Sequence, residues 1–265
     1  MCQTLFTEKS GGKLFVVPKS SGPLLAVLPL KYVHFFWQGD DCPKPWPKNQ
    51  TNDTFRPTSC LDYLSRGACI CGMYKLYDNA GNSYPAYCDL KSEPGTAWTL
   101  VMSWANMHRA LPSFRNVPLK GNAPVNENAQ NWNLYRLSLT RMRSLQAHST
   151  HWRATCSYPT YGVDFRDYVR GNFKDFNVVD FSGSSMCMKV EYVNILGHMG
   201  MHLKARVWQS TSYFWHISDS GCQFDPTSVS VSSEDYFGYY VNINPRFRCN
   251  EGPHSTTQWW FGAHL

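Results

Sequence analysis

Ten cysteines, spread along the whole 265-residue chain, limit most strongly what this sequence can fold into. Their wide spacing suits disulfides better than a single metal cluster, because structural zinc requires two close pairs of Cys or His ligands. Cys69-x-Cys71 is the tightest spacing, and no second cysteine pair faces it. Disulfides persist in oxidising compartments, so we expect a secreted, extracellular protein. The cysteines stand at positions 2, 42, 60, 69, 71, 88, 156, 187, 222 and 249.

The composition indicates a folded chain with one sizeable core. Hydrophobic residues make up 43% of the chain and charged residues 17%, which is low against a usual charged content of roughly 25%. The net charge of +6 is scattered, without the Lys/Arg run that follows a phosphate backbone, so we expect no nucleic-acid partner. No segment of the sequence is long and apolar enough to span a membrane, so we expect no membrane insertion.

Two parts of the chain differ in composition. Residues 1–57 contain seven prolines and few periodic apolar positions, which is typical of an N-terminal extension and linker. This part also carries two N-glycosylation sequons, at Asn49 and Asn52, which fit an extracellular location. Residues 58–265 have the pattern of a globular domain.

Short strand-like runs dominate the globular part. Residues 73–77, 98–102 and 152–156 indicate strands, and residues 186–193 alternate most clearly. Residues 134–146 are the best helix candidate, because their apolar residues recur at roughly helical spacing. These elements predict an α+β fold with short strands, long loops and disulfides.

The stretch from Cys60 to Val101 has the most specific order of residues. A bridge between Cys60 and Cys88 would staple the opening of a domain that starts with little core of its own. In chain order the stretch contains Ser59-Cys60, Gly72-Met73-Tyr74, Tyr87-Cys88-Asp89-Leu90 and Trp98-Thr99-Leu100-Val101.

This order resembles the start of the fibrinogen-like C-terminal domain. That family typically shows Ser-Cys, a Gly-x-Tyr strand, Tyr-Cys-Asp-Met and Gly-Trp-Thr-Leu-Val in the same succession. The resemblance extends loosely over residues 58–265, and it implies a fibrinogen C-terminal-like fold and a secreted binding module. The intelectin-like lectins also carry an extra cysteine soon after the Ser-Cys start, a feature to which Cys69 and Cys71 are similar.

The C-terminal segment departs from the family pattern. The family has Asp-x-Asp where this chain has Asn242-Ile243-Asn244, and no cysteine follows Trp260 here. Because Ca²⁺ favours charged oxygen ligands, the loss of two carboxylates makes the family's calcium site doubtful. Nearby acidic residues could make a different site, so calcium stays open as a cofactor. The candidate ligands are Asp219, Asp225, Asn242 and Asn244.

The missing C-terminal cysteine leaves Cys249 to find another partner. Cys222 is the nearest candidate, while Cys156 and Cys187 lie on two strand-like segments and could pair across a sheet. The pairing of the cysteines at positions 2, 42, 69 and 71 stays open. One of these could join another chain and give a disulfide-linked oligomer.

The Trp259-Trp260 pair admits two interpretations. The first is core packing, because tryptophans bury large apolar areas. In lectin-like members of the resembled family, residues near the C-terminal disulfide shape a pocket for acetyl groups. The second interpretation is therefore an aromatic wall for a sugar or acetyl group. Its candidate ligand-binding residues are Trp259, Trp260, Tyr239, Tyr240 and His254.

No catalytic arrangement stands out in the sequence, which lacks a Gly-x-Ser-x-Gly elbow and a Gly-rich phosphate loop. We therefore predict a secreted, non-catalytic binding module that recognises carbohydrate or an extracellular protein. The alternative is a structural or adhesive component of an extracellular or skeletal matrix, in which the domain is a disulfide-linked building block.

Overall fold

A computed structural model describes residues 6–10, 13–17, 55–218, 221–229 and 235–265. The first two ranges form a separate antiparallel pair, β1 (Phe6–Ser10) and β2 (Lys13–Val17). Asn49 and Asn52, the predicted glycosylation sites, lie outside the described residues, as does most of the predicted extension.

One large antiparallel sheet organises the rest of the described chain. Its order is β12-β11-β10-β9-β8-β7-β13-β5-β4-β3, and β6 pairs with β5 beside this path. The strands are β3 (Gly72–Tyr77), β4 (Ser83–Asp89), β5 (Thr96–Ala105), β6 (Leu134–Arg136), β7 (His151–Cys156), β8 (Tyr168–Asn172), β9 (Gly183–Ile195), β10 (His198–Gln209), β11 (His216–Ser218), β12 (Asp235–Tyr236) and β13 (Thr256–His264).

Short helices connect the strands of this sheet. The helix α1 begins at a capping box, in which the backbone N–H groups of Thr58 and Ser59 donate to the Asp62 carboxylate. The backbone N–H of Cys60 then donates to Thr99 Oγ1, which ties α1 to β5. The helices are α1 (Cys60–Leu64), the 3₁₀ helix η1 (Asn106–His108), α2 (Pro112–Arg115), α3 (Leu139–Ala147) and α4 (Tyr158–Tyr161).

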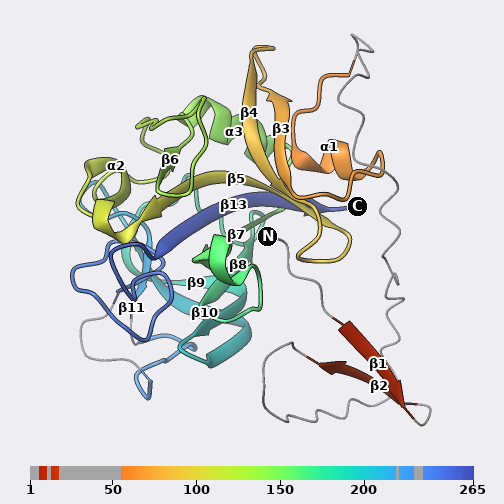
Figure 1. Ribbon diagram of the computed structural model, residues 1–265. Helices are drawn as coiled ribbons and strands as arrows, with labels where there is room; N and C mark the ends of the chain where they lie inside the picture. Colours follow the sequence, from red (N-terminus) through yellow and green to blue (C-terminus); the bar gives the residue numbers. More distant parts are fainter. Residues whose placement is uncertain (1–5, 11–12, 18–54, 219–220, 230–234) are drawn as a thin grey trace.

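The C-terminal strand β13 occupies the centre of the sheet, between β5 and β7 (Figure 1). All ten residues of β5 and all but the last of β13 are buried, so both faces of the sheet are covered there. Six tryptophans fill the interior, and Trp259 packs against Trp152 and Trp215 with ring centroids 5.8 and 4.7 Å apart. Such aromatic pairs stabilise the fold by more than the apolar area that they bury would give.

The structure confirms a sheet-rich α+β fold and corrects one of its elements. The four predicted strands lie within β3, β5, β7 and β9. The predicted helix over residues 134–146 is wrong at its start, because residues Leu134–Arg136 form β6 and the helix α3 begins only at Leu139. Pairing of β6 with Met102–Trp104 of β5 overrides the local helical spacing.

The disulfides confirm one predicted pair and correct two. Cys60 bonds to Cys88, as predicted, and joins α1 to β4. The candidate pairs of Cys156 with Cys187 and of Cys222 with Cys249 are wrong, because Cys156 bonds to Cys249 and Cys187 bonds to Cys222. Strand β8 separates β7 from β9, so Cys156 and Cys187 are separated by at least two strand spacings, about 9–10 Å, and a disulfide cannot span that distance.

The sequence leaves the pairing of the remaining cysteines open. Cys69 and Cys71 are also disulfide-bonded, and Cys2 and Cys42 lie outside the described residues.

In the part of the chain that the structure describes, no helix is long and apolar enough to cross a membrane.

A buried arginine holds the long connection between β5 and β6. The Arg136 side chain is fully buried, and its guanidinium donates to the backbone carbonyls of Ser113, Val117, Pro118 and Gly121. Burial lowers the pKa of Arg136 to about 10, so the group still carries its charge at neutral pH. The four hydrogen bonds therefore fix the path of the backbone through α2 and the loop after it.

Replacing Arg136 by lysine tests this role. A lysine ammonium has three donors, so at least one of the four buried carbonyls would lose its partner. We expect the free energy of unfolding, measured by urea denaturation, to fall by about 1–3 kcal/mol. The matched control is Arg143→Lys on the exposed face of α3, which should change the stability little. Equal stability of the two variants would contradict the carbonyl-holding role.

Candidate functional site

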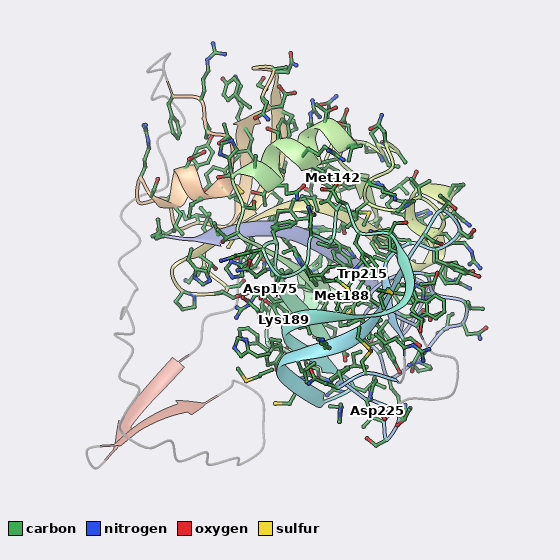
Figure 2. All side chains as sticks on the ribbon, turned by 180° about the vertical axis from the view of Figure 1, so that it is seen from behind. Met142, Asp175, Met188, Lys189, Trp215 and Asp225 are labelled. Carbon is green, nitrogen blue, oxygen red and sulfur yellow. A yellow bond between two sulfur atoms is a disulfide. The ribbon has the colours of Figure 1, made fainter. Side chains whose placement is uncertain are left out.

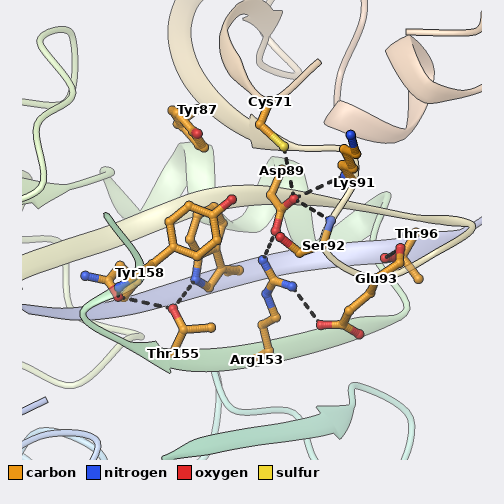
Figure 3. A network of polar contacts seen from close by, with 12 residues as sticks. Cys71, Tyr87, Asp89, Lys91, Ser92, Glu93, Thr96, Arg153, Thr155 and Tyr158 are labelled. Atoms are coloured by element: carbon orange, nitrogen blue, oxygen red, sulfur yellow. Dashed lines mark hydrogen bonds and ion pairs between the residues drawn. The ribbon is translucent and has the colours of Figure 1, made fainter. Parts of the chain in front are cut away.

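A buried ion cluster occupies the face of the sheet over β7 (Figure 3). Arg153 is fully buried, and its guanidinium bonds to Asp89 Oδ2 at 2.6 Å and to Glu93 Oε1 at 2.7 Å. The same guanidinium lies over the rings of Trp98 and Trp260, 4.5 and 4.8 Å from their centroids. Ion pairing and contact with two rings therefore both hold the buried guanidinium in place.

The cluster continues outward along the next strands. Glu93 also accepts hydrogen bonds from Tyr168 Oη and Arg170 Nη1, at 2.7 and 2.8 Å. Arg170 then pairs with Glu191, and Glu191 lies 3.2 Å from His151 Nε2. Charges therefore alternate in sign from the interior to the surface, which is the arrangement that compensates buried ions.

The carboxylate of Asp89 makes this cluster sensitive to acid. Burial alone raises the pKa of Asp89, but the neighbouring Arg153 charge and its hydrogen bonds hold this pKa below its ordinary value. The lowered pKa means that the ionised carboxylate favours the folded state above about pH 4. This contribution to stability is lost as the pH falls through the lowered pKa.

The Asp89→Asn variant should show both effects. At pH 7 its free energy of unfolding should fall by about 3–5 kcal/mol, because Arg153 keeps its buried charge while losing one partner. Between about pH 4 and pH 2, it should lose less further stability than the natural protein does. Urea denaturation over a pH series measures both quantities, with the exposed Asp180→Asn as the control. An unchanged acid dependence would contradict the role of Asp89.

The structure buries three of the five residues that were predicted to form an aromatic wall. Trp259 and Trp260 are fully buried, and Tyr240 is 1% exposed. Neighbouring residues of a strand point to opposite faces, and both faces of β13 are covered, so each tryptophan packs inside. Tyr239 is half-buried against Tyr213, while His254 is exposed in the loop before β13. The core-packing interpretation therefore holds for the Trp pair.

Two of the four candidate calcium ligands hold local turns. Asp225 is exposed at the edge of the molecule (Figure 2), where Oδ1 accepts hydrogen bonds from the backbone and hydroxyl of Thr227. Asn244 is buried, and its Oδ1 accepts from the backbone N–H of Arg246 at 3.0 Å. Asn242 is exposed, and Asp219 lies outside the described residues. Within the described ranges, no group of three or more His, Cys, Asp or Glu residues could hold a metal ion.

A cleft of about 470 Å³ lies where several loops meet, and none of the residues of the predicted wall lines it. We name it the arginine cleft, because three arginines line it against a single glutamate. Its walls come from the end of α4, the loop before β8, the turn between β9 and β10, the loop 221–229 and the loop before β13. The lining residues are Tyr161, Arg166, Leu196, Ser228, Val229, Pro245, Arg246, Arg248 and Glu251.

Asp167 joins three of these walls from beneath. It is fully buried, and its Oδ1 accepts the backbone N–H of Leu196 at 2.7 Å while Oδ2 accepts that of Arg248 at 3.1 Å. Asp167 has a φ of 48°, and Phe165, two residues before it, has a φ of 61°. Residues other than glycine rarely adopt such angles, and they persist where the surroundings hold them in place. Burial raises the pKa of Asp167 against the lowering effect of these hydrogen bonds.

Contacts of both its backbone and its side chain hold Arg248 in place. Its backbone carbonyl accepts from Ser157 Oγ at 2.8 Å, and its Nη1 bonds to both carboxylate oxygens of Asp164 at 2.7 and 2.8 Å. The guanidinium lies over the Tyr161 ring, 4.2 Å from the centroid. The adjacent disulfide between Cys249 and Cys156 anchors the same loop to β7. One wall of the cleft is therefore rigid.

The other arginines are more open to solvent. Arg246 is exposed, and its Nη2 donates to the carbonyl of Val229 at 2.8 Å. The side chain of Arg166 is 50% exposed. Glu251 accepts from the hydroxyl of Tyr161 at 3.2 Å. Guanidinium donors, a carboxylate acceptor and an aromatic ring suit a ligand with hydroxyl and anionic groups.

No sequence pattern predicted the arginine cleft. The sequence marks Arg248 only as the neighbour of Cys249, and the segments that form the cleft are far apart in the chain. The one available signal is Arg246-x-Arg248, two cations in a polar loop beside a cysteine. No family model matches the chain, and no curated protein matches it either.

Asp167→Asn tests the element that organises the cleft. The amide offers one acceptor oxygen in place of two, so one backbone N–H, of Leu196 or Arg248, loses its partner. We expect the free energy of unfolding to fall by about 1–3 kcal/mol. Amide hydrogen exchange should become faster at one of these two residues. Unchanged exchange at both would contradict the role of Asp167.

Proposed function

We propose that the chain is a secreted, non-catalytic binding module whose arginine cleft recognises carbohydrate that carries acidic groups. The observation that carries this proposal is the lining of the cleft, in which three arginines stand beside one glutamate and a tyrosine ring. Guanidinium groups donate paired hydrogen bonds to sulfate and carboxylate groups, and an aromatic ring offers a face to a sugar.

Arg246 is the residue best placed to reach a ligand. It is exposed at the cleft, and its described side-chain contact uses one of the five N–H donors of a guanidinium. Arg248, in contrast, is paired with Asp164 and stacked on Tyr161, so it shapes the wall. The mildly basic chain would also attract an acidic glycan at a distance.

A fibrinogen-like fold is part of this proposal. The bond between Cys60 and Cys88 and the strands around it agree with the order of residues that carries the resemblance. Secretion is supported in the same way, since disulfides are common in extracellular proteins.

The Arg246→Ala variant tests the proposed function. We expect the natural protein to bind a heparin-derived oligosaccharide, as measured by isothermal titration calorimetry. The variant should bind about tenfold more weakly, because one charge-assisted contact is lost. Its affinity should also depend less on salt. Arg143→Ala, outside the cleft, is the matched control and should bind as the natural protein does.

The same titration with calcium and with a chelator tests the cofactor. Binding that requires calcium would show that the protein uses calcium as a cofactor. Absence of binding to acidic and neutral oligosaccharides alike would contradict the carbohydrate proposal. It would favour an extracellular protein ligand or the structural, adhesive matrix role.

A further inference from the structure

The three described disulfides differ in their access to solvent. Cys60, Cys88 and Cys249 are completely buried, and Cys156 is 4% exposed. Cys187 is exposed and its partner Cys222 is half-buried. Thiol–disulfide exchange requires an attacking thiolate to reach a disulfide sulfur, so access decides which bond reacts first.

A cation lies beside the exposed bond. Arg206 stands directly opposite Cys187 in the ladder of β9 and β10. Its guanidinium also packs against Gly221, the residue before Cys222, so closely that a Cβ there would lie 2.9 Å from Nη1. A neighbouring positive charge lowers the pKa of a cysteine thiol and makes its thiolate a better leaving group.

The surroundings of Cys71 are opposite in charge. Its Sγ lies 3.2 Å from Oδ1 of Asp89, whose carboxylate is held ionised by Arg153 (Figure 3). A negative charge at that distance repels an attacking thiolate and disfavours a leaving one. Among the three described disulfides, exposure singles out the bond between Cys187 and Cys222, and the local charge distinguishes it from the half-buried Cys71.

The exposed bond ties down one wall of the arginine cleft. Cys222 belongs to the described segment 221–229, and Ser228 and Val229 of the same segment line the cleft. The carbonyl of Val229 accepts the hydrogen bond from Arg246 Nη2. The disulfide therefore fixes the same loop that carries the contact of Arg246.

The middle of this loop has an anchor of its own. Phe224 is buried, and its backbone N–H donates to the carbonyl of Lys204 at 3.0 Å. This hydrogen bond does not depend on the disulfide. Loss of the disulfide should therefore loosen the loop without releasing it completely.

We propose that the bond between Cys187 and Cys222 is a thiol–disulfide exchange site, and that its reduction by a small thiol such as glutathione loosens the loop 221–229. In the first step a glutathione thiolate attacks Cys187 Sγ, forms a mixed disulfide and releases the Cys222 thiolate. A second glutathione thiolate attacks the glutathione sulfur of that mixed disulfide and releases the Cys187 thiolate. Oxidised glutathione leaves, and the two cysteine thiolates take up protons.

Limited reduction of the full chain tests the exchange site. The native protein is treated with reduced glutathione, and new thiols are trapped with N-ethylmaleimide and located by peptide mass spectrometry. We expect Cys187 and Cys222 to be labelled at least about tenfold faster than the four buried cysteines, because access limits the exchange. Labelling of any other cysteine ahead of this pair would overturn the proposal.

Variants of Arg206 test the role of the cation. Arg206→Gln should slow the reduction of this bond several-fold, whereas Arg206→Lys, which keeps the charge, should leave the rate near that of the natural protein. Equal reduction rates in the two variants would show that the charge of Arg206 does not speed the exchange.

Hydrogen exchange measures the consequence for the loop. The Cys187→Ser/Cys222→Ser variant should show faster amide exchange in residues 221–229 than the natural protein, while the peptide around Arg248 stays unchanged. Unchanged exchange in the loop would overturn the proposed loosening.

Control of ligand binding by this bond rests on the proposed function of the cleft. If that function holds, the same double variant should bind the heparin-derived oligosaccharide several-fold more weakly than the natural protein. If neither protein binds while the loop exchange still rises, the exchange site stands and the carbohydrate function fails. If both proteins bind equally well, the bond does not control the cleft.

Discussion

The guanidinium of Arg153 is the charge on which the centre of this fold depends. It lies in the interior over the rings of Trp98 and Trp260, and two carboxylates compensate its charge, one from the end of β4 and one from the loop that follows. An uncompensated charge there would be very costly, so the loop, β7 and the central strand β13 are obliged to stay together. The C-terminal strand β13 pairs with β7 on one side and with β5 on the other, so it lies in the middle of the sheet beside this charge.

The arginine cleft forms where the loop before β13 returns to the sheet. The loop before β13 must return to the end of β7, where Cys249 bonds to Cys156 and Arg248 is fixed by Asp164 and Asp167. The opposite wall, the loop 221–229, is tied by a disulfide that solvent reaches. The cleft is therefore lined by two kinds of segment. The loop before β13 is held by a buried disulfide, and the segment 221–229 is held by a solvent-exposed one.

Local features of the fold could be predicted from the sequence, and long-range ones could not. The bond between Cys60 and Cys88 was predictable because both cysteines belong to one compact stretch. The start of α3 was not, since residues 134–136 pair with a strand about thirty positions earlier. The other two disulfides depend on the order of strands in the sheet, and the burial of Trp259 and Trp260 depends on what covers each face. The cleft combines distant segments through one buried carboxylate, Asp167, and gives no local pattern.

The central claim is that the arginine cleft is the surface that binds ligand. The most direct measurement is the change in backbone amide NMR shifts when a sulfated oligosaccharide is added to the full chain. The account predicts that the largest changes cluster at Tyr161, Arg246 and Glu251. Changes centred on Tyr239 and His254, or scattered evenly over the basic surface, would contradict it.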